Sequence, residues 1–370
     1  MNPGSGGVPI REIAHQPVRG SVYGALSLTG TCAKERTALM TITSTVDHNT
    51  EIERKNTMHP DGLKRVIDEL SAHRVDEQMG IVWGGGDPTA NPHTYEGMRY
   101  ARARGITSSF LTNGVFLDVN QCLETDPVLI RISLNCGTEE SYRKFHGYPR
   151  GWDYFDRVKK NMRDLARRKL ETGARTLVGI SLIADERNLD DVIAAAHLIR
   201  DVVVDSGRGF DYVIARPVMN YEHFDAKWAR LKEGTVNRAH ELLSEGGEAW
   251  QVFHDLGIPL VLIKDSFEER PAQEEDSPSD CLAYGFYGEI RHNGDVQLCS
   301  DSYGNPKYKI GNLFDPSLVF HPIHRAVFGA SVAELTLDFI MWCRSRGVNV
   351  AACDEDSAQM YMLDAPIRLV

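Results

Sequence analysis

Short apolar runs alternate with amphipathic helical patterns through the first 220 residues of the chain. Runs rich in branched aliphatic and aromatic residues, bounded by glycine and polar residues, are typical of buried strands. Runs of this kind predict strands at 22–30, 79–85, 106–114, 128–135, 176–184 and 210–218. Between them, helical spacing is clearest over 60–75, where Leu63, Val66, Ile67 and Leu70 fall on one face.

Three further segments carry helical patterns between the predicted strands: 93–105, which Gly105 closes, 138–170, interrupted near Tyr148, and 189–203. Strands that alternate with helices favour a parallel sheet with right-handed crossovers. Six strands are too few for a closed eight-stranded barrel. The predicted fold class is therefore α/β, with an open or partial (β/α)6 TIM-like barrel.

The remaining chain has a different character. Residues 224–258 look helical, whereas 265–280 are acidic and contain prolines, as linkers do. Two β-rich runs then flank Asn293-Gly294, a strong hairpin signal. We therefore expect four parts. Residues 1–21 form a flexible N-terminal arm and 22–220 the barrel. Residues 221–280 form a helical connection with an acidic linker, and 281–370 a small C-terminal β-hairpin module.

Composition and charge limit the kinds of partner and the cellular location that we expect. Lys and Arg number 41 against 52 Asp and Glu, a net charge of −11, which disfavours a general nucleic-acid-binding surface. No run of about 18 apolar residues predicts a membrane span, and the first 20 residues lack a secretory signal core. We expect a cytoplasmic protein, in which the seven cysteines are thiols or metal ligands.

Glycines and polar residues collect where the predicted strands end, and ligands of parallel α/β sheets bind at that edge. Glycines from Gly84 let backbone approach a ligand, Asp87 can accept from an ammonium group, and Arg216 can pair with a carboxylate. Ser133 and Asn135, on one face of a strand, suit ribose hydroxyls. Together they describe S-adenosylmethionine (SAM). The candidate set is Gly84, Gly85, Gly86, Asp87, Asn113, Ser133, Asn135, Ser181 and Arg216.

Four segments carry a family resemblance: WGGGDPTANPH, FLTNG, RISLNCGTEESYRKFHG and LVGISLIADERNLDDV. Their order resembles the radical SAM superfamily, in particular members with a C-terminal SPASM or twitch domain. The resemblance implies a (β/α)6 partial barrel and covers about 22–220 and 281–315. It also implies that Asp87 helps to hold the methionine amino group of SAM, and that Ser133 and Asn135 bind its ribose.

One motif of the family is degenerate. Family members hold an active-site [4Fe–4S] cluster with C-x3-C-x2-C in the loop after strand one. Cys32 follows the predicted first strand, but Arg36 and Leu39 stand at the next two positions. Neither side chain has a lone pair for iron at neutral pH. We therefore expect the active-site cluster to be absent and the radical chemistry lost.

A second set of cysteines lies in the C-terminal part. Cys281-x12-Gly294-x4-Cys299 resembles the start of a twitch or SPASM domain. With Cys343 and Cys353, these thiolates are candidates for one auxiliary [4Fe–4S] cluster, against the alternatives of zinc or a metal-free module. Cys122 and Cys136 are predicted to be buried small hydrophobes.

Three functions remain open. The first is a non-radical partner or substrate-binding protein for a catalytic radical SAM or other enzyme of a natural-product or peptide-modification pathway. The second is a SAM-binding or otherwise active enzyme that uses the barrel mouth for polar chemistry. The third is a radical SAM enzyme with unusual cluster ligation. In each case the ligand is a small molecule or peptide, and no nucleic acid or membrane partner is expected.

Overall fold

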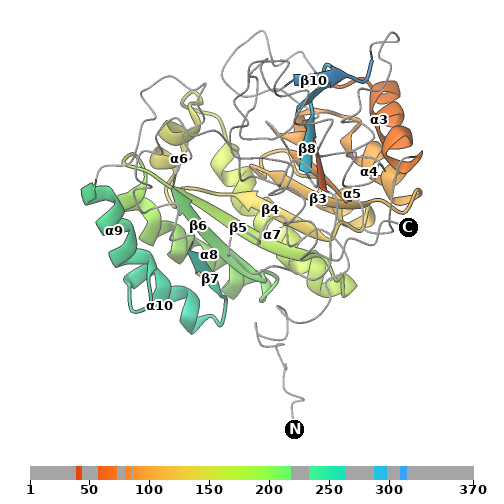
Figure 1. The fold of residues 1–370 in the computed structure, drawn as a ribbon. Helices are drawn as coiled ribbons and strands as arrows, with labels where there is room; N and C mark the ends of the chain where they lie inside the picture. The colour runs from red at the N-terminus through yellow and green to blue at the C-terminus, as the bar shows by residue number, and fades with distance from the viewer. Residues whose placement is uncertain are drawn as a thin grey trace, which may run out of the picture.

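The strands within the described residues form a single sheet in a computed structural model of the protein (Figure 1). The structure describes residues 39–43, 57–72, 80–84, 87–217, 233–262, 287–297 and 309–314. The ten strands are β1 (Leu39–Thr43), β2 (Gly80–Gly84), β3 (Thr107–Thr112), β4 (Leu129–Ser133), β5 (Leu177–Ala184), β6 (Tyr212–Pro217), β7 (Leu260–Leu262), β8 (Tyr287–Ile290), β9 (Asp295–Gln297) and β10 (Lys309–Asn312).

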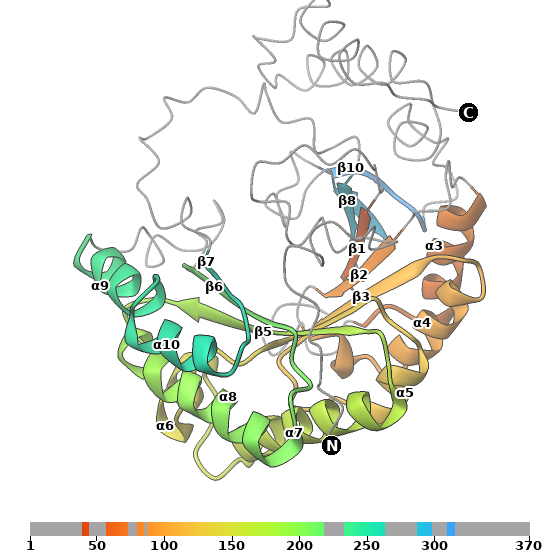
Figure 2. The same ribbon diagram turned by 90° about the horizontal axis from the view of Figure 1, so that it is seen from below.

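The helices lie along the convex side of this curved sheet (Figure 2). The α-helices are α3 (Pro60–Ala72), α4 (Thr94–Arg102), α5 (Val119–Glu124), α6 (Glu139–His146), α7 (Tyr154–Thr172), α8 (Val192–Ser206), α9 (Glu233–Leu243) and α10 (Glu248–Asp255). Two single turns of 3-10 helix precede α4 and α8: η2 (Pro88–Ala90) and η3 (Leu189–Asp191).

Strands β1 to β6 are parallel and follow one another in sequence order across the sheet. This order, with helices between the strands, confirms the predicted α/β fold and agrees with a partial barrel. Strand β7 adds to β6 and β8 adds to β1, both parallel. The carboxyl ends of the six central strands therefore meet at one edge of the sheet.

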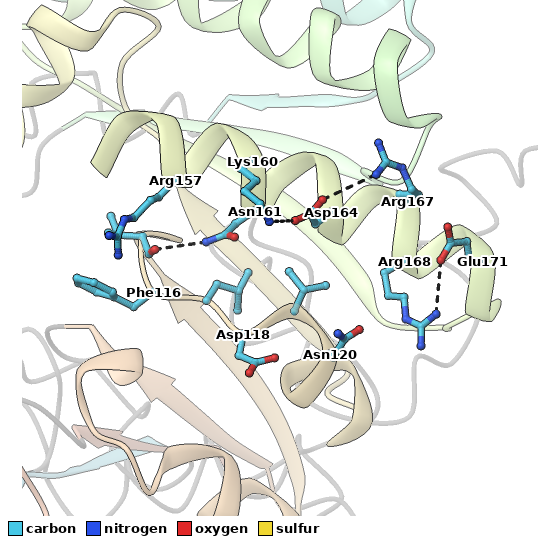
Figure 3. Close-up of a pocket in the computed structure, with 13 residues that line it drawn as sticks. Phe116, Asp118, Asn120, Arg157, Lys160, Asn161, Asp164, Arg167, Arg168 and Glu171 are labelled. Atoms are coloured by element: carbon cyan, nitrogen blue, oxygen red, sulfur yellow. Dashed lines mark hydrogen bonds and ion pairs between the residues drawn. The ribbon is translucent and has the colours of Figure 1, made fainter. Parts of the chain in front are cut away.

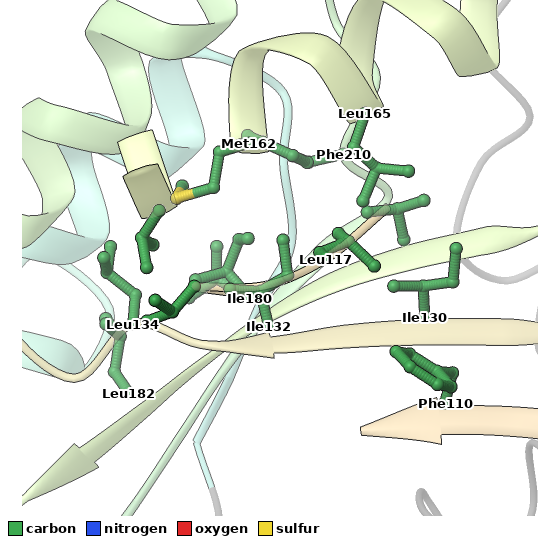
Figure 4. Close-up of a cluster of buried hydrophobic side chains, with 14 of the residues drawn as sticks. Phe110, Leu117, Ile130, Ile132, Leu134, Met162, Leu165, Ile180, Leu182 and Phe210 are labelled. Carbon is green, nitrogen blue, oxygen red and sulfur yellow. The ribbon is translucent and has the colours of Figure 1, made fainter. Parts of the chain in front are cut away.

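Strand residues alternate between two apolar clusters, one on each face. The larger cluster fills the space between the sheet and the helices, where side chains of β4 and β5 meet those of α7 (Figure 4). A smaller cluster of Leu129, Tyr212 and Ile214 lies on the opposite face. Examples from the larger cluster are Phe110, Ile130, Ile132, Met162, Leu165, Ile180, Leu182 and Phe210.

Most predicted elements are confirmed, and α3 shows why. Its buried residues are the four that the helical spacing selected, because a helix of this pattern has one apolar face to pack against the sheet. The predicted break between two helices falls where Gly147 takes a left-handed conformation, with φ of 70°, at the end of α6. Helix α5 was not predicted, because six residues are too few to show a period.

The first strand of the barrel is not where the sequence placed it. The segment 22–30 lies outside the described residues, and the strand that pairs with β2 is β1, Leu39–Thr43. Five successive apolar or threonine residues account for this strand. Leu39 therefore begins β1 and does not lie in a loop after it, which corrects the assignment of Leu39 to the cluster motif.

The predicted hairpin is present. Strands β8 and β9 are antiparallel, and Gly294 between them has a φ of 84°, a conformation that glycine adopts without strain. Because β8 also pairs with β1, the hairpin continues the sheet of the barrel. Among the described helices, none is both long and apolar enough to cross a membrane.

Candidate functional site

Polar side chains replace the apolar ones near the carboxyl end of the concave face. Strand alternation places Ser133 on the same face as Leu129, and Ser181 on the same face as Leu177. Ser133 and Ser181 are in register on neighbouring strands. Their hydroxyls therefore lie on adjacent strands, as recognition of two neighbouring ligand hydroxyls requires.

Arg216 completes this part of the face. It lies on β6, in register with Ile183 of β5 and two residues beyond Ile214, whose side chain belongs to the concave cluster. Alternation therefore puts its guanidinium on the same face as the two serines. The structure thus brings together Ser133, Ser181 and Arg216 from three successive strands.

Asp87 lies three residues beyond the end of β2, at the N-cap of η2, and its carboxylate binds the surrounding loops. It is only 4% exposed. Its carboxylate accepts hydrogen bonds from the Thr89 amide (2.9 Å) and hydroxyl (2.5 Å), the Thr112 hydroxyl (2.9 Å) and the Asn113 amide (2.6 Å). These bonds join the turn after β2 to the end of β3. The role of Asp87 toward a methionine amino group stays a prediction beside this observed role.

Asn135 departs from the expected geometry. Strand β4 ends at Ser133, and Asn135 has a left-handed backbone with φ of 62°. Its side-chain oxygen accepts from the Ile183 amide at 3.0 Å. The reasoning that Ser133 and Asn135 share a strand face is therefore wrong, because alternation ends with the strand.

The other residues of the predicted set are placed as follows. The Asn113 side-chain oxygen accepts from the Val115 amide at 2.9 Å, which closes the turn after β3. Gly84 is the last residue of β2, and a Cβ there would meet only Leu111 at ordinary contact distance. Gly85 and Gly86 lie outside the described residues.

Sequence reasoning missed a half-buried cationic group deeper in the concave face. Arg131 lies on β4, two residues before Ser133, and forms a hydrogen bond with Tyr212 of β6. The ring of Tyr212 crosses Gly179 of β5, where a Cβ would overlap it. The signal was a single arginine inside the apolar run 128–135, since a charged residue within a strand of apolar residues is uncommon.

Two cysteines fall within the described residues, and both predictions for them are confirmed. Cys122 and Cys136 are fully buried and free. Burial raises the pKa of Cys136 to about 12, so its thiol stays protonated. Among the described residues, no group of three or more His, Cys, Asp or Glu is arranged to hold a metal ion. Arg36 lies outside the described residues, and so do the other five cysteines: Cys32, Cys281, Cys299, Cys343 and Cys353.

A groove lies on the other side of the sheet, between α5 and α7 (Figure 3). Its volume is about 740 Å³. Charged residues along α7 pair with one another, as Lys160 does with Asp164 at 2.5 Å and Arg168 with Glu171 at 3.5 Å. Each of the four cations that line the groove thus has a carboxylate within 4 Å on or beside α7, so none of them marks a ligand site.

Comparisons with known proteins agree with this geometry. Residues 32–199 match the family model described as Radical SAM superfamily. No curated protein matches the chain. Solved structures that share its fold at low identity include the following three.

Streptococcus suis SuiB is 13% identical with a TM-score of 0.54, and the match covers 82% of this chain and 70% of SuiB. SuiB bound to S-adenosylmethionine is 14% identical with a TM-score of 0.51, covering 76% of this chain and 62% of that one. Native anSMEcpe with bound AdoMet and Cp18Cys peptide is 14% identical with a TM-score of 0.52, covering 80% and 81%.

The family implies SAM and a [4Fe–4S] cluster as cofactors. The fold and the ordered strand ends agree with the match of residues 32–199 to the Radical SAM superfamily model.

Proposed function

We propose that this protein uses a radical SAM fold without the radical-initiating cluster, as a substrate-binding partner of a catalytic enzyme in a biosynthetic pathway. The observation that carries the proposal is the position of β1. In the family motif, cluster cysteines follow the first strand. Here that strand is Leu39–Thr43, and the sequence that follows it, 44–56, contains no cysteine.

The donor set therefore does not fit a [4Fe–4S] cluster after β1. Such a cluster needs thiolates, and the chain holds no cysteine between Cys32 and Cys122. Cys32 precedes β1, and Cys122 is buried in α5 on the helix side of the sheet. One thiolate before the strand does not replace three after it.

The residues present do fit part of SAM. Ser133 and Ser181 offer hydroxyls for a ribose, and Arg216 offers a guanidinium for a carboxylate, all on one face near the carboxyl ends of β4 to β6. A nucleoside-like ligand is thus compatible with this face. For the substrate class, the fold likeness to anSMEcpe, solved with a bound peptide, supports a peptide.

The test is SAM cleavage by the full chain. The protein is reconstituted anaerobically with iron and sulfide, reduced with dithionite and given SAM, and 5′-deoxyadenosine is measured. We expect none above the level of a protein-free control, because no cluster lies where an electron can reach SAM. Reductant-dependent 5′-deoxyadenosine would overturn the proposal and favour a radical enzyme with unusual ligation.

A matched variant separates the two cysteine sets. Cys281→Ser with Cys299→Ser removes two of the four candidate ligands of an auxiliary cluster. Iron that disappears in this variant belongs to the C-terminal set. Iron that remains and cleaves SAM contradicts the proposal. Polar chemistry, the second candidate, is favoured by the Ser133, Ser181 and Arg216 group. Transfer of the SAM methyl group to a supplied nucleophilic acceptor, with release of S-adenosylhomocysteine and without reductant, would support it.

A further inference from the structure

The concave face carries a positive charge below the level of the proposed SAM residues. Arg131 precedes Ser133 by two residues on β4, which places it roughly 7 Å further from the carboxyl end of the strand. Its partner in register is Gly179 of β5, and the next strand brings Tyr212 opposite the same glycine. Arg131, Gly179 and Tyr212 thus occupy one layer across three strands.

Glycine at 179 permits this arrangement. The Tyr212 ring occupies the space that a side chain on β5 would fill, so its hydroxyl reaches the Arg131 guanidinium. Tyrosine keeps its proton at neutral pH, because burial raises its pKa. The pair therefore presents an N–H fork and an O–H group on the same face, which are donors that suit oxyanions.

A second cation lies close to Arg131 on the concave face. Burial lowers the pKa of Arg131, and the nearby positive charge of Arg216 acts in the same direction. A guanidinium nevertheless stays protonated in proteins. An oxyanion held by Arg131 also gains Coulomb stabilisation from Arg216.

We propose that Arg131 and Tyr212 bind an anionic group, a carboxylate or a phosphate, of the substrate taken up on the concave face. The proposal rests on the substrate-binding role proposed above and names the chemical class of the ligand. It is separate from the SAM carboxylate, which is assigned to Arg216 nearer the strand ends. The guanidinium fork matches an oxyanion in two parallel hydrogen bonds, with Tyr212 donating a third.

The experiment is a thermal-shift titration of the full chain at fixed ionic strength with succinate, inorganic phosphate and neutral succinamide. We expect an anion to raise the unfolding midpoint and succinamide to leave it unchanged. The anion that acts distinguishes a carboxylate from a phosphate source. In Arg131→Gln, the apparent affinity is expected to fall about tenfold or more, as for a lost charge-assisted bond. Arg131→Lys should recover part of it.

Two further variants test the Tyr212 hydroxyl and an unrelated surface cation. Tyr212→Phe removes only the hydroxyl and should weaken anion binding by a few fold, whether or not Arg131→Gln folds. Arg102→Gln removes an exposed cation that pairs with Asp126 at 3.0 Å, and should bind as wild type does. Equal binding by wild type, Arg131→Gln and Tyr212→Phe would overturn the proposal.

Two other results would also overturn it: an equal loss in Arg102→Gln, or loss of the anion effect in saturating SAM, since the site would then be the SAM carboxylate site. These outcomes are independent of 5′-deoxyadenosine formation. Failure here is therefore distinguishable from failure of the proposed function.

Discussion

Asp87 shows that the residue type sets the chemistry of a side chain, whereas the local backbone decides which groups that side chain faces. Sequence position put this carboxylate just beyond the end of a strand, where the structure finds it. Its acceptor oxygens, however, face donors from Thr89, Thr112 and Asn113. Asn135 is similar, since its positive φ turns the side chain toward β5. Residue types and the approximate places of β2 to β6 were predictable, but the last residue of β4 and the partners that depend on backbone dihedrals beyond it were not.

Asp87→Asn is expected to destabilise the protein by about 2–4 kcal/mol, because the amide nitrogen faces N–H and O–H donors and leaves buried groups unpaired. Urea unfolding followed by tryptophan fluorescence measures the loss. Asp201→Asn is the control, because Asp201 is exposed and pairs with its neighbour Arg200 at 2.9 Å. A surface pair of this kind contributes under about 1 kcal/mol. Equal losses in both variants would contradict the bracing role of Asp87.

At the scale of elements, periodicity worked where elements were long. The one-faced pattern of α3 gave its buried residues, and the apolar run 176–184 gave β5. Two short elements were not predicted. Helix α5 has six residues, and β1 has five that resemble any apolar stretch. Strand β1 is defined by its parallel partners β2 and β8, which are distant in sequence and leave no local signal.

Helix α5 has a cap whose contribution depends on pH. The Asp118 carboxylate accepts from the Gln121 amide at 3.0 Å and its side chain at 2.9 Å. The hydrogen bond from the Gln121 side chain, then that from its backbone, lowers the pKa of Asp118 below its ordinary 3.8. The ionised carboxylate therefore stabilises the folded state fully above 3.8, and this contribution is lost as pH falls through the lower folded value.

Asp118→Ala should cost about 1 kcal/mol at pH 7, as N-cap removals do. The difference from wild type should shrink below pH 3.8. Asp118→Asn keeps an acceptor without a charge and should cap with little dependence on pH. Denaturant unfolding of the three proteins from pH 7 to pH 3 measures these differences. A constant difference between wild type and Asp118→Ala over that range would rule out the ionised cap.

At the scale of the whole molecule, one sheet connects segments that the sequence assigned to separate parts. Strand β8 comes from the predicted C-terminal module, and its register with β1 pairs Thr41 with Glu289. Glu289 is 1% exposed, on the face opposite Ile290 of the core. Local patterns predicted the hairpin but not its place, because docking against β1 depends on contacts between segments about 250 residues apart.

The position of each strand in the sheet predicts its protection in amide hydrogen exchange. Strands β4 and β5 pair on both sides and pack Ile132 and Ile180 against α7, so their amides should exchange most slowly. Strand β7 ends the described sheet on one side and β10 on the other, and both should exchange faster.

Ile180→Ala tests whether the barrel unfolds as one unit. Ile180 is fully buried, so the substitution should cost about 2–5 kcal/mol. If β2 to β6 open together, exchange should accelerate by a similar factor in all five strands. Val204→Ala, at a side chain 74% exposed on α8, should leave exchange unchanged. Acceleration confined to β5 would show instead that the strands open separately, and that the concave face is not held by a single cooperative sheet.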